Sequence, residues 1–162
     1  MKKQKITKIL FIIYIIILVW IILFKLSFNF SDIGRLRSVN LIPFKYDIET
    51  TFQLKEVIDN ILIFIPMGVL LKMLRIDNKR TILFGFLTSL SFEIMQYMFQ
   101  IGVSDITDII TNTTGTIIGM LFYIILCKIF KNREKIDKIL KILGTIGLIL
   151  FLILIIIILV NN

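Results

Sequence analysis

The chain has 162 residues and is strongly apolar, with 57% hydrophobic and 19% charged residues and a mean hydropathy of +0.95. A soluble domain of this length has too little interior to bury so much apolar side chain. The apolar residues also gather in long runs, each close to the about 20 residues that a helix needs to cross a bilayer. These features predict a small integral membrane protein and leave no room for a separate soluble domain.

The net charge of +8 does not indicate a nucleic-acid-binding protein. The basic residues lie in the gaps between apolar runs rather than along one solvated face. The chain has no histidine, and Cys127 is its single cysteine. A disulfide within the chain and a Cys/His zinc site are therefore excluded, and we expect no cofactor and no metal. Cys127 lies near the end of an apolar run, where a small core residue is expected.

Five apolar runs predict an all-α, polytopic transmembrane helix bundle that forms a single domain over residues 1–162. The first run follows Met-Lys-Lys-Gln-Lys but is long for a signal peptide and lacks a small-x-small cleavage site. It is therefore interpreted as a retained span. Pro66 is expected to kink the second span, and Gly68 follows it. The expected spans are about 6–26, 57–74, 81–100, 105–129 and 139–160.

The basic residues predict the orientation of the spans, because lysine and arginine are retained on the cytoplasmic side. Of the 19 basic residues, four lie near the N-terminus, four within 72–80 and six within 128–141. All three segments fall on one side if five spans alternate. We therefore expect a multi-pass membrane protein with a cytoplasmic N-terminus and an external C-terminus. The expected external loop covers 27–56, and its apolar Asn40-Leu-Ile-Pro-Phe44 stretch is expected to lie on or dip into the membrane surface.

Ionisable and amide side chains within the expected spans are candidate functional residues, because such groups are costly in a bilayer. Glu93 lies in the third span, in phase with Gln96 and Gln100. The fourth span opens with three residues at the same spacing, and the second span opens with two more. These five residues are Asp105, Asp108, Asn112, Asp59 and Asn60.

The short connection 101–104 makes the third and fourth spans antiparallel neighbours. Counting at about 1.5 Å per residue from its two ends, we expect Glu93 at the depth of Asn112, and Gln96 near Asp108. Gly115 and Gly119 continue the same face and are expected to let helices pack closely.

Together these positions predict a polar pocket in the outer half of the membrane, lined by the second, third and fourth spans. The external residues Arg35, Arg37 and Lys45 could supply its countercharge. Structural roles remain open at several positions. Asp59 and Asp105 could be first-turn acids that complement a helix dipole, and Asn112 could join two helices.

The polar positions resemble the motifs of the VanZ-like family of bacterial membrane proteins. The chain from 40 to 119 carries NLIPF at 40–44, NxxxFxPxG at 60–68, ExxQ at 93–96 and DxxDxxxNxxGxxxG at 105–119. Each element is weak alone, but four in this order and spacing are specific. Many members carry an arginine three residues before the first aspartate, where this chain has Gly102. Arg35 or Arg37 would then have to supply that charge.

The resemblance implies a role in the cell envelope, since the family is named for a protein that lowers susceptibility to teicoplanin. The favoured hypothesis is a non-enzymatic membrane protein that lowers susceptibility to glycopeptide antibiotics through the outward-facing pocket. Its expected partners are the lipid bilayer and either a lipid-linked cell-wall precursor or the glycopeptide itself, with no nucleic acid.

Two other functions stay open. An intramembrane enzyme could act on an envelope lipid or lipid-linked sugar with Glu93 and Asp108 as an acid/base pair. Against it, the sequence shows no histidine, no GxSxG and no cysteine in the outer half. A small transporter is the other alternative, although no comparable polar residues line the inner half.

Overall fold

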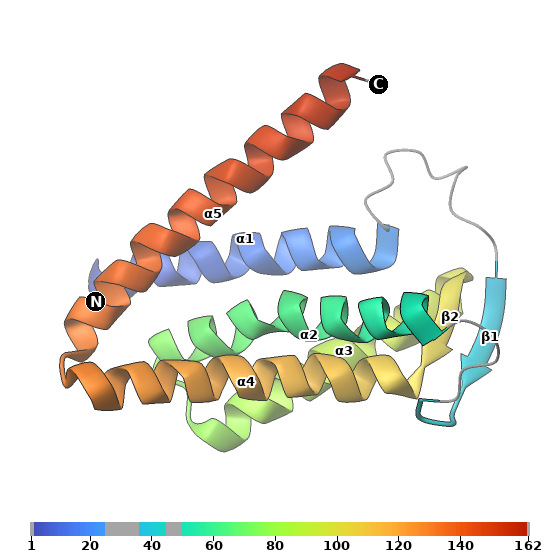
Figure 1. The fold of residues 1–162 in the computed structure, drawn as a ribbon, viewed down its shortest axis with the longest axis horizontal. Coiled ribbons are helices and arrows are strands. Elements are labelled where there is room, and N and C mark those ends of the chain that lie inside the picture. Colours follow the sequence, from blue (N-terminus) through green and yellow to red (C-terminus); the bar gives the residue numbers. More distant parts are fainter. Residues whose placement is uncertain (1, 25–35, 45–49, 162) are drawn as a thin grey trace.

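The computed structural model describes residues 2–24, 36–44 and 50–161, which form a bundle of helices with one short sheet (Figure 1). The predicted helical fold class is confirmed, but the sheet was not predicted. The elements in chain order are α1 (Lys2–Phe24), β1 (Leu36–Asn40), α2 (Thr50–Met73), α3 (Asn78–Phe99), β2 (Ile101–Asp105), α4 (Ile106–Phe130) and α5 (Arg133–Asn161).

Four of the described helices, α1, α3, α4 and α5, are long and apolar enough to cross a membrane. The predicted second span corresponds to α2, which has 24 residues but carries Lys55, Glu56 and Asp59 in its first half. This helix begins at Thr50, so the expected external loop ends seven residues earlier than predicted. The number of crossings therefore depends on α2.

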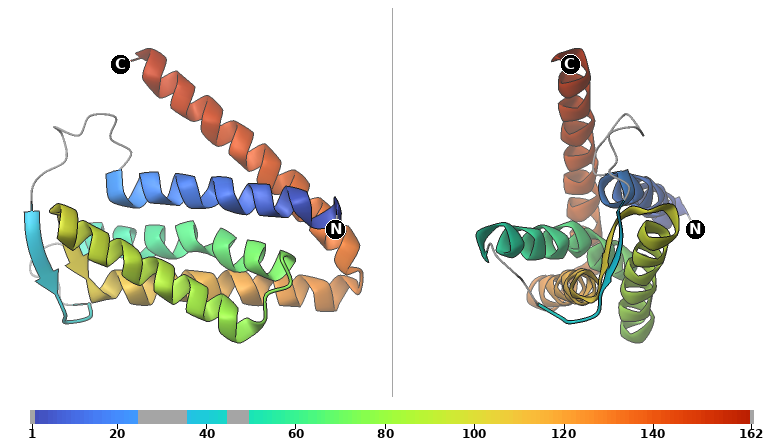
Figure 2. Two further views of the ribbon diagram at one scale, coloured as in Figure 1. Left: turned by 180° about the vertical axis from the view of Figure 1, so that it is seen from behind. Right: turned by 90° about the vertical axis from the view of Figure 1, so that its right-hand side faces the viewer.

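The helices α1 to α4 lie alongside one another, whereas α5 leans away from them toward its C-terminus (Figures 1 and 2). The N-terminus lies at the same end of the bundle as the start of α5, and the sheet lies at the opposite end (Figure 1). We call this opposite end the sheet end.

Glycines allow α2 and α4 to approach each other closely. A Cβ added at Gly115 would collide with the carbonyl oxygen of Ile61, and one at Gly119 with that of Ile65. On the other helix, a Cβ at Gly68 would collide with the carbonyl oxygen of Thr116. The two backbones therefore touch at positions where only glycine fits, as is common between helices in membranes.

A cluster of buried apolar residues joins α1 to α2 and α3. Leu18, Phe64 and Leu71 are at most 2% exposed, and the Phe64 and Phe92 rings meet edge to face with centroids 6.5 Å apart. Tyr14 packs against this cluster, and its hydroxyl donates a hydrogen bond of 2.9 Å to the carbonyl oxygen of Ile63. This bond joins α1 to the part of α2 that precedes Pro66.

Local caps fix both ends of α3. Asp77 accepts a hydrogen bond of 2.9 Å from the Arg80 backbone N–H, and this bond lowers the pKa of the Asp77 carboxyl. Gln100 ends the helix with a left-handed φ of 59°. The chain then continues as β2, which pairs in parallel with β1 from Leu36 opposite Ile101 to Asn40 opposite Asp105.

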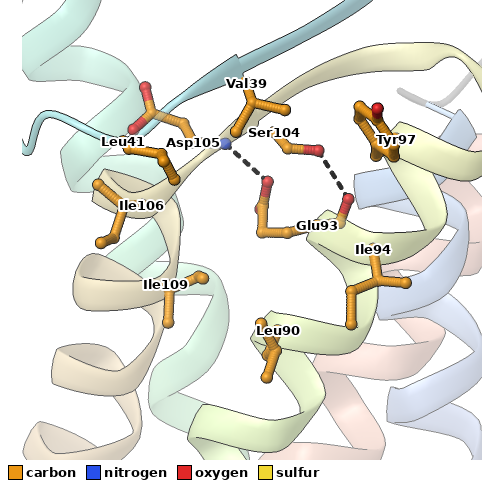
Figure 3. Close-up of a pocket in the computed structure, with 10 residues that line it drawn as sticks. All are labelled: Val39, Leu41, Leu90, Glu93, Ile94, Tyr97, Ser104, Asp105, Ile106 and Ile109. Atoms are coloured by element: carbon orange, nitrogen blue, oxygen red, sulfur yellow. Dashed lines mark hydrogen bonds between the residues drawn. The ribbon is translucent and has the colours of Figure 1, made fainter.

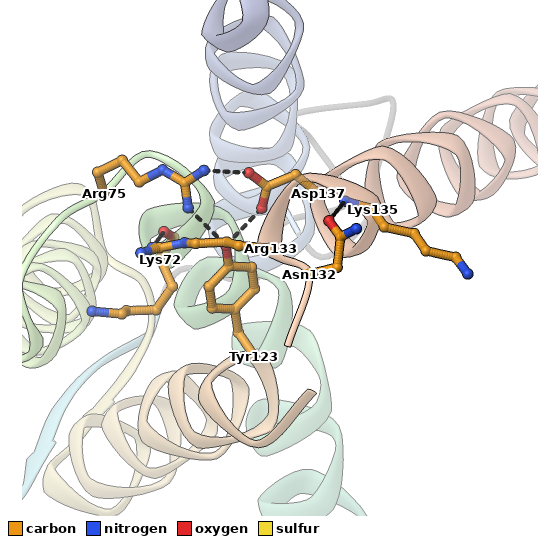
Figure 4. Close-up of polar contacts among 7 residues, drawn as sticks. All are labelled: Lys72, Arg75, Tyr123, Asn132, Arg133, Lys135 and Asp137. Carbon is orange, nitrogen blue, oxygen red and sulfur yellow. Dashed lines mark hydrogen bonds and ion pairs between the residues drawn. The ribbon is translucent and has the colours of Figure 1, made fainter. Parts of the chain in front are cut away.

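A polar cluster joins the start of α5 to the rest of the bundle (Figure 4). The Tyr123 hydroxyl donates to Asp137 Oδ1 at 2.6 Å, and the Arg75 guanidinium donates to Asp137 Oδ2 at 2.6 Å. Arg75 and Arg133 each also donate to the Tyr123 hydroxyl oxygen at 3.0 Å. Beyond this cluster, none of the α5 side chains that the structure describes is buried.

Candidate functional site

The carboxyl group of Glu93 lies at the sheet end, where α3 meets β2. It is 5% exposed, and its Oε2 accepts a hydrogen bond of 2.8 Å from the Asp105 backbone N–H (Figure 3). The Ser104 hydroxyl donates to the Glu93 carbonyl oxygen at 2.7 Å. Strand β2 is therefore bound to the last turns of α3 through both the side chain and the backbone of Glu93.

Asp105 links the start of α4 to the last residue of β1. Its Oδ1 accepts the Thr107 backbone N–H at 2.7 Å, which caps α4, and its Oδ2 accepts from the Asn40 amide at 2.9 Å. The Thr107 hydroxyl in turn accepts the Phe44 backbone N–H at 3.1 Å. Asp105 thus acts as a helix cap and also holds the apolar 40–44 stretch, whose Leu41 and Ile42 are exposed.

Asp108 and Asn112 continue this polar network into the bundle. The Asn60 amide on α2 donates to Asp108 Oδ1 at 2.8 Å, and the Asn112 amide donates to the Ser89 hydroxyl at 2.9 Å. Ser89 donates a longer hydrogen bond of 3.4 Å to the Asp108 carbonyl oxygen. Side chains from α2, α3 and α4 therefore meet in one layer.

The expectation that Glu93 and Asn112 lie at the same depth in the bundle is wrong. Glu93 contacts Asp105, whereas Asn112 contacts Ser89, which lies about one helical turn deeper on α3 than Glu93. The reason is β2. An extended segment rises about 3.3 Å per residue, so the chain runs back along α3 before α4 begins, and the start of α4 lies deeper than a tight turn would place it.

The remaining predicted residues occupy different surroundings. Gln96 is buried and donates to the Ile22 carbonyl oxygen at 3.3 Å, whereas Asp59 is exposed. Arg35 and Lys45 lie outside the described residues. Arg37 lies on β1 directly opposite Gly102 in the sheet.

A cavity of about 290 Å³ opens beside Glu93, between α3 and α4 and beneath β1 (Figure 3). Glu93, Ser104 and Asp105 border it at one end, but their polar atoms take part in the hydrogen bonds described above and leave almost no polar surface in the cavity. The rest of its wall is mainly aliphatic. The lining residues are Val39, Leu41, Leu90, Glu93, Ile94, Tyr97, Ser104, Asp105, Ile106 and Ile109. None of these lining residues comes from α2. Asn60, Asp108 and Asn112 are not among them either, and they bond to side chains of neighbouring helices instead.

Several residues of the network were not predicted as site residues. Asn40, Ser89, Ser104 and Thr107 all make the hydrogen bonds described above. A signal existed for Asn40, which opens the NLIPF element. Serine and threonine give no comparable signal, because their hydroxyls commonly bond to helix backbone within apolar spans.

Comparison with known proteins establishes the family. The model of the VanZ/LLP1 family matches residues 11–130. The chain belongs to the VanZ/LLP1 family. It is 40% identical over 129 residues to Protein VanZ of Enterococcus faecium, an alignment that covers 77% of each chain. No solved structure matches this chain. The predicted family resemblance is therefore confirmed, and α5 lies beyond the matched range.

The four VanZ-like sequence elements meet at the sheet end. Asn40 of the first element bonds to Asp105 of the fourth, and Asn60 of the second bonds to Asp108. Glu93 of the third accepts the Asp105 N–H. Elements that lie up to 65 residues apart in the chain therefore form a connected hydrogen-bond network in this VanZ/LLP1 family protein.

Proposed function

We propose that this chain is a multi-pass protein of the bacterial cell membrane that lowers susceptibility to glycopeptide antibiotics such as teicoplanin. The identity of 40% to Protein VanZ over 77% of both chains supports this role, since the VanZ-like family is named for teicoplanin resistance. The proposal concerns the outer face of the membrane, where glycopeptides meet cell-wall precursors.

The proposed orientation places the sheet end outside. The opposite end carries the N-terminal lysines, the α2–α3 turn with Lys72 and Arg75, and the basic segment 128–141. Basic residues mark the cytoplasmic side. Five crossings then give a cytoplasmic N-terminus and an external C-terminus.

The buried carboxyl group of Glu93, which lies beside the cavity, is the observation on which the proposed mechanism rests. This site would hold a lipid-linked cell-wall precursor or the glycopeptide and so change how the two meet. Among the described contacts, the Asp105 N–H holds the Glu93 carboxyl group in place, and the Asn60 amide holds that of Asp108.

The test is teicoplanin and vancomycin susceptibility of a sensitive Gram-positive host that expresses the chain. We expect the wild type to raise the inhibitory concentration of teicoplanin, and Glu93→Gln to remove that protection at equal membrane abundance. Asp59→Asn is the matched control, because Asp59 is exposed and takes no part in the contacts described above.

Two results would refute parts of this proposal. No protection by the wild type would refute the resistance role. Full protection by Glu93→Gln would keep that role but refute the part given to the cavity.

A further inference from the structure

The polar cluster at the start of α5 holds more positive than negative charge (Figure 4). Its carboxyl group belongs to Asp137, whose side chain is 12% exposed, and both oxygens are taken, one by Tyr123 and one by Arg75. Arg133 donates to the Tyr123 hydroxyl and to the Lys72 carbonyl oxygen, and among the described contacts no carboxyl group pairs with it. Two guanidinium groups therefore share one carboxylate in a partly buried cluster, and a second anion would balance their charge.

Both guanidinium groups keep N–H donors for such an anion. Arginine carries five N–H groups in a planar fork that suits phosphate oxygens. Arg75 and Arg133 each use two of them in the described contacts, which leaves three on each. The Arg75 side chain is 38% exposed and Arg133 is exposed, so an anion can reach both. Because both groups donate to the Tyr123 hydroxyl oxygen at 3.0 Å, they lie close enough to bind the same phosphate.

The charge of the surrounding segments favours an anion as well. The segments 72–80 and 128–141 meet at this end of the bundle and hold ten basic and three acidic residues. Their net charge of +7 is nearly all of the chain's +8. A ligand with a net negative charge therefore gains more from this end than a zwitterionic or neutral one does.

An apolar groove of about 340 Å³ lies deeper in the bundle on the same side of α5 as the cluster. Gly144, Leu148 and Phe151 line it, and they follow Asp137 by seven, eleven and fourteen residues, which places them on one face of the helix with Asp137. Helix α2 contributes Leu70, which lies five residues before Arg75. The remaining wall comes chiefly from α1. The lining residues are Leu10, Ile13, Tyr14, Ile17, Pro66, Leu70, Gly144, Gly147, Leu148 and Phe151.

The cluster and the groove together fit a molecule with an anionic head and an apolar chain. The cluster lies where α4 ends and α5 begins, at the level of the lipid headgroups if both helices cross the membrane. Along α5, Gly144 lies about 10 Å from Asp137, so an acyl chain can enter the groove while its phosphate stays at the arginines. A soluble anion would use the arginines alone, and a neutral lipid would use the groove alone.

We propose that this end of the bundle binds an anionic phospholipid. Its phosphate accepts hydrogen bonds from Arg75 and Arg133, and one acyl chain lies between α1, α2 and α5. This site lies at the opposite end of the bundle from Glu93 and goes beyond the proposed function.

The test uses the full chain in phosphatidylcholine vesicles that contain a trace of one of two photoreactive lipids. Both lipids carry the same diazirine-bearing acyl chain, but one is an anionic phosphatidylglycerol and the other a zwitterionic phosphatidylcholine. We expect the phosphatidylglycerol to label the groove residues about fivefold more strongly, which is the effect of one basic residue on an anionic lipid. Peptide mapping locates the labels on α1, α2 and α5.

One pair of variants tests the headgroup site. Arg133→Gln removes one phosphate donor and should bring labelling by the phosphatidylglycerol down to that by the phosphatidylcholine, which itself should not change. A folding defect would instead lower labelling by both lipids. Lys135→Gln is the matched control, because it removes the same charge and its side chain points away from the cluster (Figure 4).

A second pair of variants tests the groove. Gly147→Phe fills the groove at a position where an added Cβ would meet no atom within 4 Å, and it should remove the groove labels of both lipids. Leu150→Phe is the control, because Leu150 is 60% exposed and does not line the groove. Thermal unfolding of each variant checks that the bundle is intact.

Equal labelling by the two lipids in the wild type would overturn the headgroup assignment, and groove labels that persist in Gly147→Phe would overturn the chain assignment. Inorganic phosphate, compared with chloride at equal ionic strength, serves as a soluble competitor and should leave the labels unchanged. Displacement by it would assign the arginines to a soluble anion instead. Because labelling is measured without any antibiotic, a negative result here is distinguishable from a failure of the proposed resistance role.

Discussion

At the scale of single residues, the hydrogen bond between Asn60 and Asp108 shows how neighbouring positions differ. Asn60 Nδ2 lies 2.8 Å from Asp108 Oδ1, in the region where Gly115 brings α4 against the backbone of α2. Asp59, the preceding residue, is exposed. Asn60 thus joins two helices, whereas Asp59, one residue earlier, lies on the exposed surface of α2.

Replacing Asn60 with leucine should therefore destabilise the fold. Removal of the donor leaves a partly buried carboxyl group with one hydrogen bond fewer, so we expect Asn60→Leu to lower the free energy of unfolding by about 1–3 kcal/mol. Asp59→Asn should change it by less than about 0.5 kcal/mol. Equilibrium unfolding in mixed micelles measures both values. Equal effects of the two substitutions would contradict the assigned hydrogen bond.

Periodicity placed some of these polar residues in one part of the bundle, but it predicted neither how they pair nor the serine and threonine residues that join them. Glu93 and Asp108 were placed in the same part of the bundle from helical spacing alone. The contact between Glu93 and Asp105 could not be predicted, because it depends on β2 running back along α3. The Asn40 contact likewise depends on the pairing of β1 with β2, which lie more than 60 residues apart in the chain. Nonlocal strand pairing leaves little trace in so short a segment.

At the scale of elements, α5 differs from the other helices because its firm contacts lie near its start. Ile136 and Asp137 are buried there, and Asp137 accepts from both Tyr123 and Arg75 (Figure 4). Farther along, the side chains are mostly exposed and almost wholly aliphatic, as expected for a helix surrounded by lipid. The polar cluster therefore holds the start of α5, and farther along the rings of Trp20 on α1 and Phe151 on α5 meet edge to face with centroids 6.5 Å apart.

We predict that Asp137→Asn loosens α5. The substitution removes the ion pair with Arg75, whose two atoms lie 2.6 Å apart, and weakens the acceptor for Tyr123. Spin labels at exposed positions on α1 and α5 should then show a broader distance distribution by pulsed electron paramagnetic resonance. Lys135→Gln is the matched control, because its side chain points away from the cluster (Figure 4). An unchanged distribution in Asp137→Asn would show that other contacts hold α5.

At the scale of the whole molecule, the helical bundle and the family were predicted from the sequence. Long apolar runs and four spaced motifs were enough for both. Whether α2 crosses the membrane was harder to predict, because the charged residues Lys55, Glu56 and Asp59 make it less apolar than the neighbouring helices. Its 24 residues nonetheless rise about 36 Å, more than the about 30 Å of a bilayer core.

Helix α2 runs from one end of the bundle to the other, as its neighbours do. It starts near the sheet end and finishes at the opposite end, where α3 begins (Figures 1 and 2). If α1, α3 and α4 cross the membrane, α2 has to cross it as well. Five crossings then place the two termini on opposite sides, and four would place them on the same side.

Single-cysteine variants test this count in a Cys127→Ser background. With five crossings, a membrane-impermeant maleimide should label Lys55→Cys near the start of α2 and Val160→Cys near the C-terminus in intact cells. Asn132→Cys, in the turn between α4 and α5, should react only after the membrane is opened. Lys55 and Val160 are both exposed, so packing within the chain does not shield them from the reagent. Labelling of Val160→Cys only after lysis, with Lys55→Cys labelled in intact cells, would mean that α5 does not cross and that the external C-terminus is wrong.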